Sequence, residues 1–448
     1  MIRSRISWIL LLILSLSLAT VHGQVEKRII FLSWKHVVDR SLKDNLSLKL
    51  KSLEYDIQNL ETWKSLSYFL PSLSYQGLAQ NNIELPVFVF MGQRFVVGTP
   101  YTFQHALSLS LPILTGGSRW LNHSMQNSIK KSLAEELQGK KEETVLNAMQ
   151  AYYGIILSGE LTRSTDEAVM VAKHNLDQVQ KFYNAGTATE LDYQRAKAQY
   201  SSTLPLLESA QSNYKLSFQR LKGLLDLPLT DSLVVVDSLE KMEFLNEYST
   251  VPLEHFKELS NEHRNDMKAL QYQQEAAKSG EHLALGQFTP SVTLIGSVDH
   301  SAPIDNARVA WSDYIRSKSI TLSISWPLLE GGKRVLDYQI AKMKSDQMGL
   351  LVKQAQQGIE LDVEQSYYNY IETSKSLQSL KETLEQYRES LRISNLLYLQ
   401  GMSNQLDVLN AQLLYTKSNT EYLQGVYRYN VSQLALLRSV GLLENIWK

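Results

Sequence analysis

The chain contains no cysteine, which excludes disulfides, cysteine-ligated zinc sites and thiol nucleophiles together. Proline is scarce, and none falls between Gly117 and Pro205, so nothing interrupts a long helix after Gly117. The formal net charge of −1 gives no reason to expect nucleic acid or a polybasic membrane patch. Past residue 23 no apolar run approaches the ~18 residues of a transmembrane helix. If this protein spans a membrane, it must do so with strands.

The first 23 residues have the pattern of a secretory signal peptide. Arg3 and Arg5 precede the apolar run 8–19, and the small residues before Gln24 suit a cleavage site. The apolar run is too short to cross a bilayer. Because no cysteine follows this site, we expect no lipoprotein-type lipid anchor on the mature chain. The sequence therefore predicts an exported protein.

An internal repeat organises the rest of the chain. The segment LSLSLPILTGGSRW (107–120) recurs as LSISWPLLEGGKRV (322–335), 215 positions later, and both pass from alternation through Pro and Gly-Gly into a helical pattern. The same offset relates 184–200 to 399–415. We therefore predict a tandem duplication, with repeats at 24–223 and 263–448 joined by a linker at 224–262.

Each repeat is expected to contain helix, strand, loop, strand and a long helical hairpin. The expected helix of the first repeat is 42–68, and its loop is 81–101, inside which 87–90 and 95–97 offer an extension of the strands. The expected strands are 72–80, 102–111, 291–299 and 319–326. The expected helical hairpins are 118–222 and 330–440, with Pro205 kinking or breaking the first returning helix.

The strands alternate in a way that suits a membrane. In 319–326 the residues Ile320, Leu322 and Ile324 point one way and serine and threonine point the other, as for lipid outside and water inside. An ordinary sheet on a soluble core would alternate in the same way, but the adjoining helices are too long for a compact domain. Four strands cannot close a membrane barrel, which needs about eight. Two protomers would supply eight and three would supply twelve, and the sequence does not choose.

Two further patterns concern the helices. Apolar residues stepping by three and four, as at Leu406, Leu409 and Leu413, predict coiled-coil seams. The tyrosine pairs 152–153 and 367–368 are interpreted as packing between helices rather than as a ligand site. The histidines lack metal-ligand spacing, and no phosphate loop, nucleophile elbow or acid–base pair is recognisable. The sequence thus predicts neither an enzyme nor a bound cofactor or metal.

These features together resemble the TolC-type outer membrane factor family, over essentially all of the mature chain. The resemblance rests on the two strand–Pro–Gly-Gly–helix junctions, the duplication and the hairpin tips 184–200 and 399–415. It implies a mixed α+β membrane protein, a homotrimer in which each protomer gives four strands to one twelve-stranded outer membrane barrel above a periplasmic tube of coiled-coil helices. It also implies a passive duct, coupled through a periplasmic adaptor protein to an inner-membrane transporter.

The resemblance assigns roles to residues at the tips. Asp407 and Asn410 match the ring of pore acids, although the second position holds an amide here, and Asp192 matches an acid that ties neighbouring hairpins. Ser403 stands where the family has its tying arginine, and Tyr398 keeps the aromatic partner. An alternative interpretation of both acids is helix N-capping, and the two roles are compatible.

The tips themselves are expected to contact the adaptor. The residues assigned to this contact are Gly186, Thr187, Gly401 and Met402, the two glycines supplying the positive φ of each turn.

The favoured function is an outer membrane exit duct for small molecules or ions. Type I protein secretion is an alternative, because such ducts can be shared between systems. A different class is a non-channel periplasmic coiled-coil scaffold, which predicts a water-soluble chain. The duct predicts a trimer that requires detergent.

Overall fold

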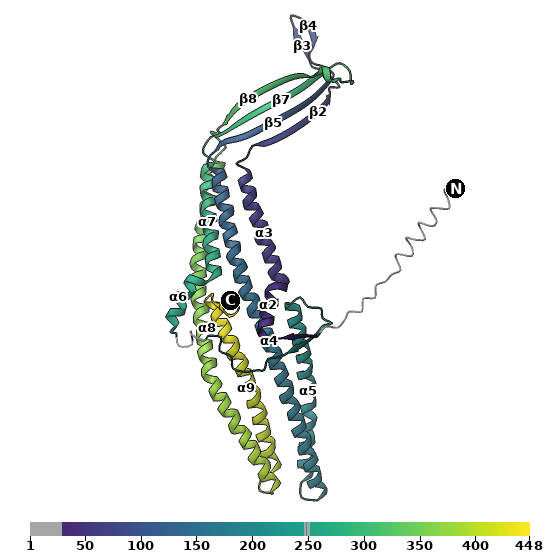
Figure 1. Ribbon diagram of the computed structural model, residues 1–448, viewed down its shortest axis with the longest axis vertical. Coiled ribbons are helices and arrows are strands. Elements are labelled where there is room, and N and C mark those ends of the chain that lie inside the picture. The colour runs from purple at the N-terminus through teal and green to yellow at the C-terminus, as the bar shows by residue number, and fades with distance from the viewer. Residues whose placement is uncertain (1–28, 246–247, 249–250) are drawn as a thin grey trace, which may run out of the picture.

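The computed structural model describes residues 29–245, 248 and 251–448, and the signal peptide predicted at 1–23 lies outside them. Figure 1 shows a sheet at one end, a column of long helices below it, and two hairpin tips at the far end. The column consists of α3 (Leu46–Ser67), α4 (Ser118–Asn184), α5 (Glu190–Leu224), α7 (Asn265–Gly286), α8 (Lys333–Leu399) and α9 (Gln405–Ser439). This architecture confirms the predicted mixed α+β class.

The sheet is antiparallel, with the strand order β2-β5-β7-β8. The strands are β2 (Ser72–Asn81), β5 (Tyr101–Thr115), β7 (Ser291–Ile304) and β8 (Ile315–Ser325). All four extend beyond the predicted ranges, β2 by one residue past 72–80 and the others by more past 102–111, 291–299 and 319–326. The strand β8 begins earlier because its backbone continues to pair with β7 past Lys318 and Arg316, where the apolar alternation has stopped. The strand β5 passes Pro112 with a register shift.

The register gives the sheet one apolar and one polar face. On the apolar face Leu111 pairs with Leu294 and Leu294 with Leu322, and Leu322 is 57% exposed. On the polar face one row across all four strands consists of serine alone: Ser74, Ser108, Ser297 and Ser319. The apolar face of the protomer therefore meets no covering layer of its own.

The segment 81–101 forms a small hairpin rather than a plain loop. Its strands are β3 (Val87–Phe90) and β4 (Gln93–Val96), joined by a turn in which Met91 and Gly92 have φ values of 49° and 82°. Among the described residues these strands pair with each other and not with β2 or β5. The two segments therefore form strands as the sequence offered, but in a sheet of their own, and Figure 1 shows this hairpin projecting beyond the larger sheet.

The helices differ from the prediction in two places. The helix expected at 42–68 is split into α2 (Trp34–Asp44) and α3 at Asn45, whose side-chain oxygen accepts from the Leu48 N–H at 3.0 Å. The Asn45 amide also donates to the Leu224 carbonyl at 2.8 Å, so the split anchors the end of α5. The helix α5 is not broken at Pro205. Its packing along α4 outweighs the one backbone hydrogen bond that proline removes.

A belt of short elements packs against the middle of the column. It contains α2, the parallel pair β1 (Ile29–Leu32) and β6 (Ser232–Val235), and α6 (Leu253–His263). Tyr152 and Tyr153 are almost fully buried beneath it, and the Tyr152 hydroxyl lies 2.8 Å from the Asp237 carboxylate and 3.0 Å from the Leu32 carbonyl. Their interpretation as packing residues is correct. Tyr368 is different, being 56% exposed in the protomer, because it faces away from the belt.

The predicted seam of α9 does not coincide with the side of this helix that is buried in the protomer. Leu406 and Leu413 are 46% and 63% exposed, whereas Val408, Ala411 and Gly425 are buried. The reason is that α9 packs against two helices, α8 and α4, so its buried side is wider than a coiled-coil seam and is built from smaller residues. A periodic row of leucines did not identify that side.

Glu142, on α4 near the belt, predicts a pH-dependent stability. Glu142 is 4% exposed, and its carboxylate accepts a hydrogen bond from the Asn265 amide at 3.3 Å. Burial first, and the charge of Glu444 second, raise its pKa to about 7. The pKa of Glu142 is higher in the folded than in the unfolded chain, where it has its ordinary value of 4.5. The folded state is therefore most stable below pH 4.5, where Glu142 is neutral in both states, and it loses stability as the pH rises to about 7. Glu142→Gln should therefore raise the free energy of unfolding by about 2 kcal/mol at pH 8 and by much less at pH 5.

Urea unfolding followed by circular dichroism at both pH values tests this. Glu143→Gln is the matched control, because Glu143 is half-exposed beside Lys140 and should change stability little at either pH. Equal effects of Glu142→Gln at pH 5 and pH 8 would contradict the prediction.

Candidate functional site

The two hairpin tips lie side by side at the end of the column far from the sheet (Figure 1). Both reverse the chain in the same way, with Gly186 and Gly401 at φ 74° and 72°. The residue after each glycine donates its backbone N–H to a carbonyl in the last turn of the preceding helix. These hydrogen bonds run from Thr187 to Phe182 and from Met402 to Leu397, both at 2.9 Å. The two turns therefore have one backbone geometry.

Both returning helices begin with a capping box. The Thr189 hydroxyl and the Asn404 side-chain oxygen accept from the N–H groups of Asp192 and Asp407 at 3.2 and 3.0 Å, and each aspartate accepts the cap residue's N–H in return. The Ser403 hydroxyl also donates to the Asp407 carboxylate at 2.7 Å. The capping role that the sequence offered for both aspartates is thus present, and Ser403 supports the second one.

Several side chains join one tip region to the other. Phe182 and Tyr398 meet edge to face with centroids 5.9 Å apart. Burial, and then the charge of Asp192, raise the pKa of Tyr398. Deeper in, the Gln405 amide donates to the Asn175 side-chain oxygen at 2.9 Å, and both residues are buried.

The Gln405–Asn175 contact was not predicted. The Asn175 amide nitrogen and the Gln405 side-chain oxygen have no hydrogen-bond partner among the described residues. Polar residues on long helices are ordinarily assigned to solvent, so the sequence contains no signal for this contact. Such half-satisfied amides are costly to bury, and the pair is a weak point between the hairpins.

The other predicted tip residues face outward in the protomer. Asn410 is exposed one turn beyond Asp407 on α9. Met402 is 72% exposed, and the Thr187 hydroxyl donates to its own hairpin, to the Phe182 carbonyl at 3.0 Å. The tips therefore present their backbone turns and Met402 to whatever lies below them.

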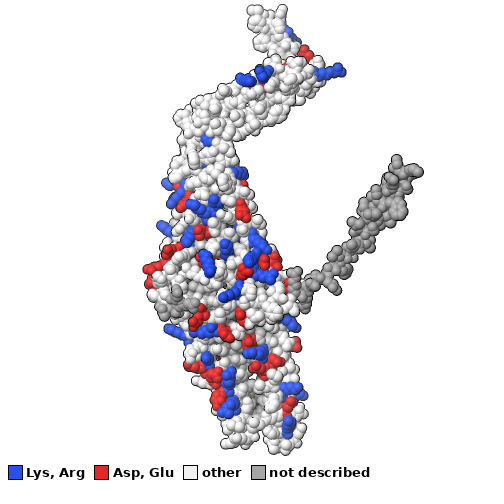
Figure 2. Space-filling view, viewed as in Figure 1, with Lys and Arg blue, Asp and Glu red and all other residues white. Residues whose placement is uncertain are grey.

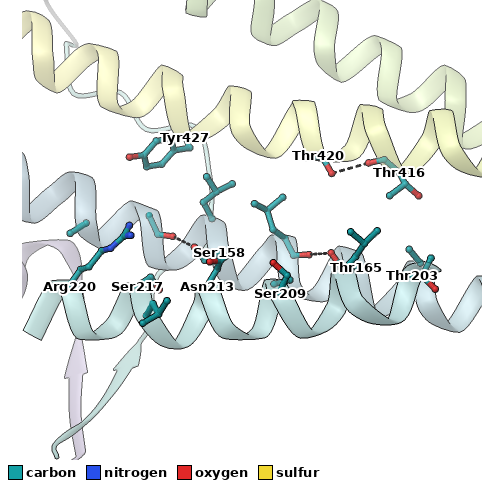
Figure 3. A pocket seen from close by; sticks show the side chains of 18 of the residues that line it. Ser158, Thr165, Thr203, Ser209, Asn213, Ser217, Arg220, Thr416, Thr420 and Tyr427 are labelled. Carbon is teal, nitrogen blue, oxygen red and sulfur yellow. Dashed lines mark hydrogen bonds between the residues drawn. The ribbon is translucent and has the colours of Figure 1, made fainter. Parts of the chain in front are cut away.

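A groove of about 1000 Å³ lies between α4, α5 and α9 (Figure 3). Its walls combine leucines with small hydroxyl side chains, among them Ser158, Thr165, Thr203, Thr416 and Thr420. On α4 the lining residues are turned to the side opposite Tyr152 and Tyr153, which face the belt. The groove therefore opens on the side of the column away from the belt.

In the part of the chain that the structure describes, no helix is both long and apolar enough to cross a membrane. Within the same residues, no group of three or more histidine, aspartate or glutamate side chains is arranged to hold a metal ion.

The model of the outer membrane efflux protein family matches residues 90–226 and 258–442. The chain belongs to this family. The match confirms the resemblance to TolC-type outer membrane factors and the predicted location in the outer membrane, with the helices extending into the periplasm. TolC of Salmonella enteritidis is 21% identical over 345 residues, which cover 73% of this chain and 66% of that protein. Nodulation protein T of Rhizobium leguminosarum bv. viciae is 27% identical over 268 residues, 56% of this chain and 52% of that protein.

Solved structures share the fold of this outer membrane efflux protein. A membrane protein from Pseudomonas aeruginosa superimposes with a TM-score of 0.79 at 18% identity, covering 92% of this chain and 96% of that one. The Campylobacter jejuni CmeC outer membrane channel gives a TM-score of 0.79 at 17% identity, covering 92% and 86%. The aligned parts of the two sequence relatives are shorter, spanning at most about two thirds of those proteins.

Proposed function

We propose that this protein is the passive outer membrane exit duct of a tripartite export system for small molecules or ions. The observation that carries the proposal is a two-faced sheet with unpaired edges, joined directly to helices of 67 residues. At ~1.5 Å per residue such a helix is ~100 Å long, which suits a tube that reaches across a periplasm.

The unpaired edges support a ring of protomers. Strands β2 and β8 each have one neighbour in the protomer, and an open edge in lipid leaves backbone groups unsatisfied. Strand β5 of the first repeat pairs with β7 of the second. In the duplication β8 is the counterpart of β5, and β2 is the counterpart of β7. Pairing β8 with the β2 of a neighbour would therefore repeat an interface that the protomer already contains. Three protomers would give the twelve strands of the family's shared barrel.

The placement of the helices follows from this arrangement. With the belt outside, the hydroxyl-rich groove between α4, α5 and α9 faces the inside of the tube. The polar face of the sheet then continues the same water-filled path through the membrane. The tips form the periplasmic end, where an adaptor protein meets Gly186, Thr187, Gly401 and Met402.

A photo-crosslinking residue at Met402, introduced in native cells, tests the proposed partners. Capture of a periplasmic adaptor belonging to a proton-driven exporter would support the efflux function. Capture of an adaptor of an ATP-driven secretion system would instead indicate that the duct exports proteins. Purification gives an independent outcome. A detergent-requiring particle of three protomers is expected, whereas a water-soluble monomer would restore the scaffold interpretation.

Asp407 is proposed to line the constriction as well as to cap α9. Asp407→Asn should lower the cation-to-anion permeability ratio of single channels in planar bilayers about twofold or more, because a trimer would lose three charges at its narrowest point. Asp192→Asn is the matched control, since it weakens the equivalent cap on α5 but does not match the ring of pore acids that the resemblance implies. Equal selectivity of Asp407→Asn and the unmodified channel would remove the pore role.

A further inference from the structure

Two basic residues lie on the apolar face of the sheet. Alternation along β8 places Lys318 and Arg316 on the same side as Ile320, Leu322 and Ile324, at the end far from the helices. Both basic side chains are exposed. Charged residues on a lipid-facing stripe are costly near the middle of a bilayer and tolerated only near its surfaces.

Aromatic residues mark the height of this pair. At the helix end of the sheet the Trp326 indole donates to the Phe288 carbonyl at 3.1 Å. Arg316 lies ten residues from Trp326, which is ~33 Å along a strand and ~25 Å across a bilayer at the usual tilt. This is the height of the apolar band of an outer membrane protein. Arg316 therefore lies at the outer headgroup level, and Lys318, two residues closer to the helices, reaches that level with its long side chain.

A second group of aromatic and histidine side chains occupies the same level. His105 and His300 are paired in the register, and His300 pairs with Arg316. The short helix η2 (Trp311–Asp313) folds back over them, so that Trp311 stacks on His300 with centroids 5.8 Å apart. The Tyr314 hydroxyl reaches His105 at 3.0 Å. Trp311 is 73% exposed, as an interfacial tryptophan would be.

The two cations form no ion pair with any carboxylate that the structure describes. Among the described residues no carboxylate lies within 4.0 Å of Arg316 or Lys318. Asp313 is turned into η2, where it accepts from the Ala310 N–H at 2.8 Å, and Asp299 lies on the polar face with Ser297. Strand β2, the proposed neighbour of β8 in the ring, contains no charged residue. Figure 2 shows basic and a few acidic side chains at this end of the sheet, and an almost uncharged surface between them and the helices.

We propose that Arg316 and Lys318 bind the phosphate group of an outer-leaflet lipid. Two residues apart on one strand, their side chains leave the sheet ~7 Å from each other and can converge on one phosphate. The acyl chains of the same lipid lie along Ile320 and Leu322, which follow Lys318 on the same face of β8, toward the end of the sheet that joins the helices. A free anion gains nothing from that apolar surface, so a lipid is the ligand rather than inorganic phosphate. The inference rests on the proposed insertion of the strands in the outer membrane.

Native mass spectrometry of the detergent-purified trimer, supplied with bisphosphorylated lipid A, tests this site. The Arg316→Gln and Lys318→Gln double variant should retain lipid A about tenfold less than the unmodified protein. The control is the double variant Arg94→Gln and Arg308→Gln, which removes the same charge from this end of the protein but not from β8. The swap Arg316→Lys with Lys318→Arg should restore retention.

Three results would overturn the proposal. They are equal retention by the Gln double variant and the control, equal retention of lipid A lacking its phosphates, and displacement of lipid A by millimolar inorganic phosphate. The trimer mass is read in the same spectra. A protein that forms no trimer would instead contradict the proposed function, so the two failures are distinguishable.

Discussion

Gly116→Ala is expected to lower the free energy of unfolding by about 3–5 kcal/mol or to prevent assembly of the proposed trimer. Gly116 is the first residue of the turn between β5 and α4, with φ 62°. A β-carbon there would collide with the Gly286 carbonyl and with the Thr289 hydroxyl, which itself donates to that carbonyl at 2.7 Å. The left-handed backbone alone costs about 1–2 kcal/mol. The larger part of the effect is the collision with the end of α7, which is backbone and cannot move aside.

Gly117→Ala separates the two causes. Gly117 has φ 75° in the same turn, but a β-carbon there meets only the end of the Leu121 side chain at 3.8 Å. We expect this variant to lose only about 1–2 kcal/mol. For both variants, thermal unfolding followed by circular dichroism measures the stability, and the yield of the proposed trimer in detergent measures assembly. Equal losses for the two variants would show that strain, not the contact with α7, makes Gly116 necessary.

The junction glycines also show what the sequence could predict. The Pro–Gly-Gly pattern and its recurrence predicted both strand-to-helix junctions, because positive φ needs glycine and the repeat made the pattern visible twice. The family and the mixed α+β fold followed from that recurrence and are confirmed. Alternation similarly predicted which side of β8 is apolar, because a strand with a single buried or lipid-facing side has a period of two.

Features set by tertiary packing were missed. The buried side of α9 depends on its contacts with two helices, so Gln405 is buried and Leu406 is exposed, against the polarity of both. The split of α2 and α3 at Asn45 depends on a carbonyl of α5, which no local pattern reveals. At the tips, the spacing between Asn404 and Asp407 predicted the capping role of Asp407. The proposed pore role depends on the arrangement of several protomers, which the sequence of one chain does not specify.

Arg264 connects three helices beside the belt. Its guanidinium makes two hydrogen bonds to Asp266 at the start of α7, at 2.9 and 2.6 Å, and one to Asp362 of α8 at 2.5 Å. It also donates to the Ser439 carbonyl at the end of α9 at 3.0 Å. The Arg264 side chain is 9% exposed. Burial works against the charge of Asp266, but the hydrogen bonds from Arg264 prevail and hold the pKa of that carboxyl below its usual range.

Arg264→Met is expected to cost about 2–4 kcal/mol of unfolding free energy. The value is below the full cost of breaking a buried pair, because the Asp266 side chain is 54% exposed and water compensates part of the loss. Arg264→Lys should recover only part of it, since an ammonium cannot reproduce the planar fork. Arg388→Met on α8 is the control: its pair with Glu385 is more than half exposed, and the expected change is below about 0.5 kcal/mol.

Adding Asp266→Asn identifies the cause. If the loss in Arg264→Met arises from a carboxylate left without its partner, the double variant should be more stable than Arg264→Met by about 1 kcal/mol. Asp362 is less dependent on Arg264, because Arg438 lies 3.8 Å from it. Urea unfolding of the four proteins in this cycle measures the coupling. A double variant no more stable than Arg264→Met would assign the cost to the unpaired Ser439 carbonyl and to lost packing between α7 and α9.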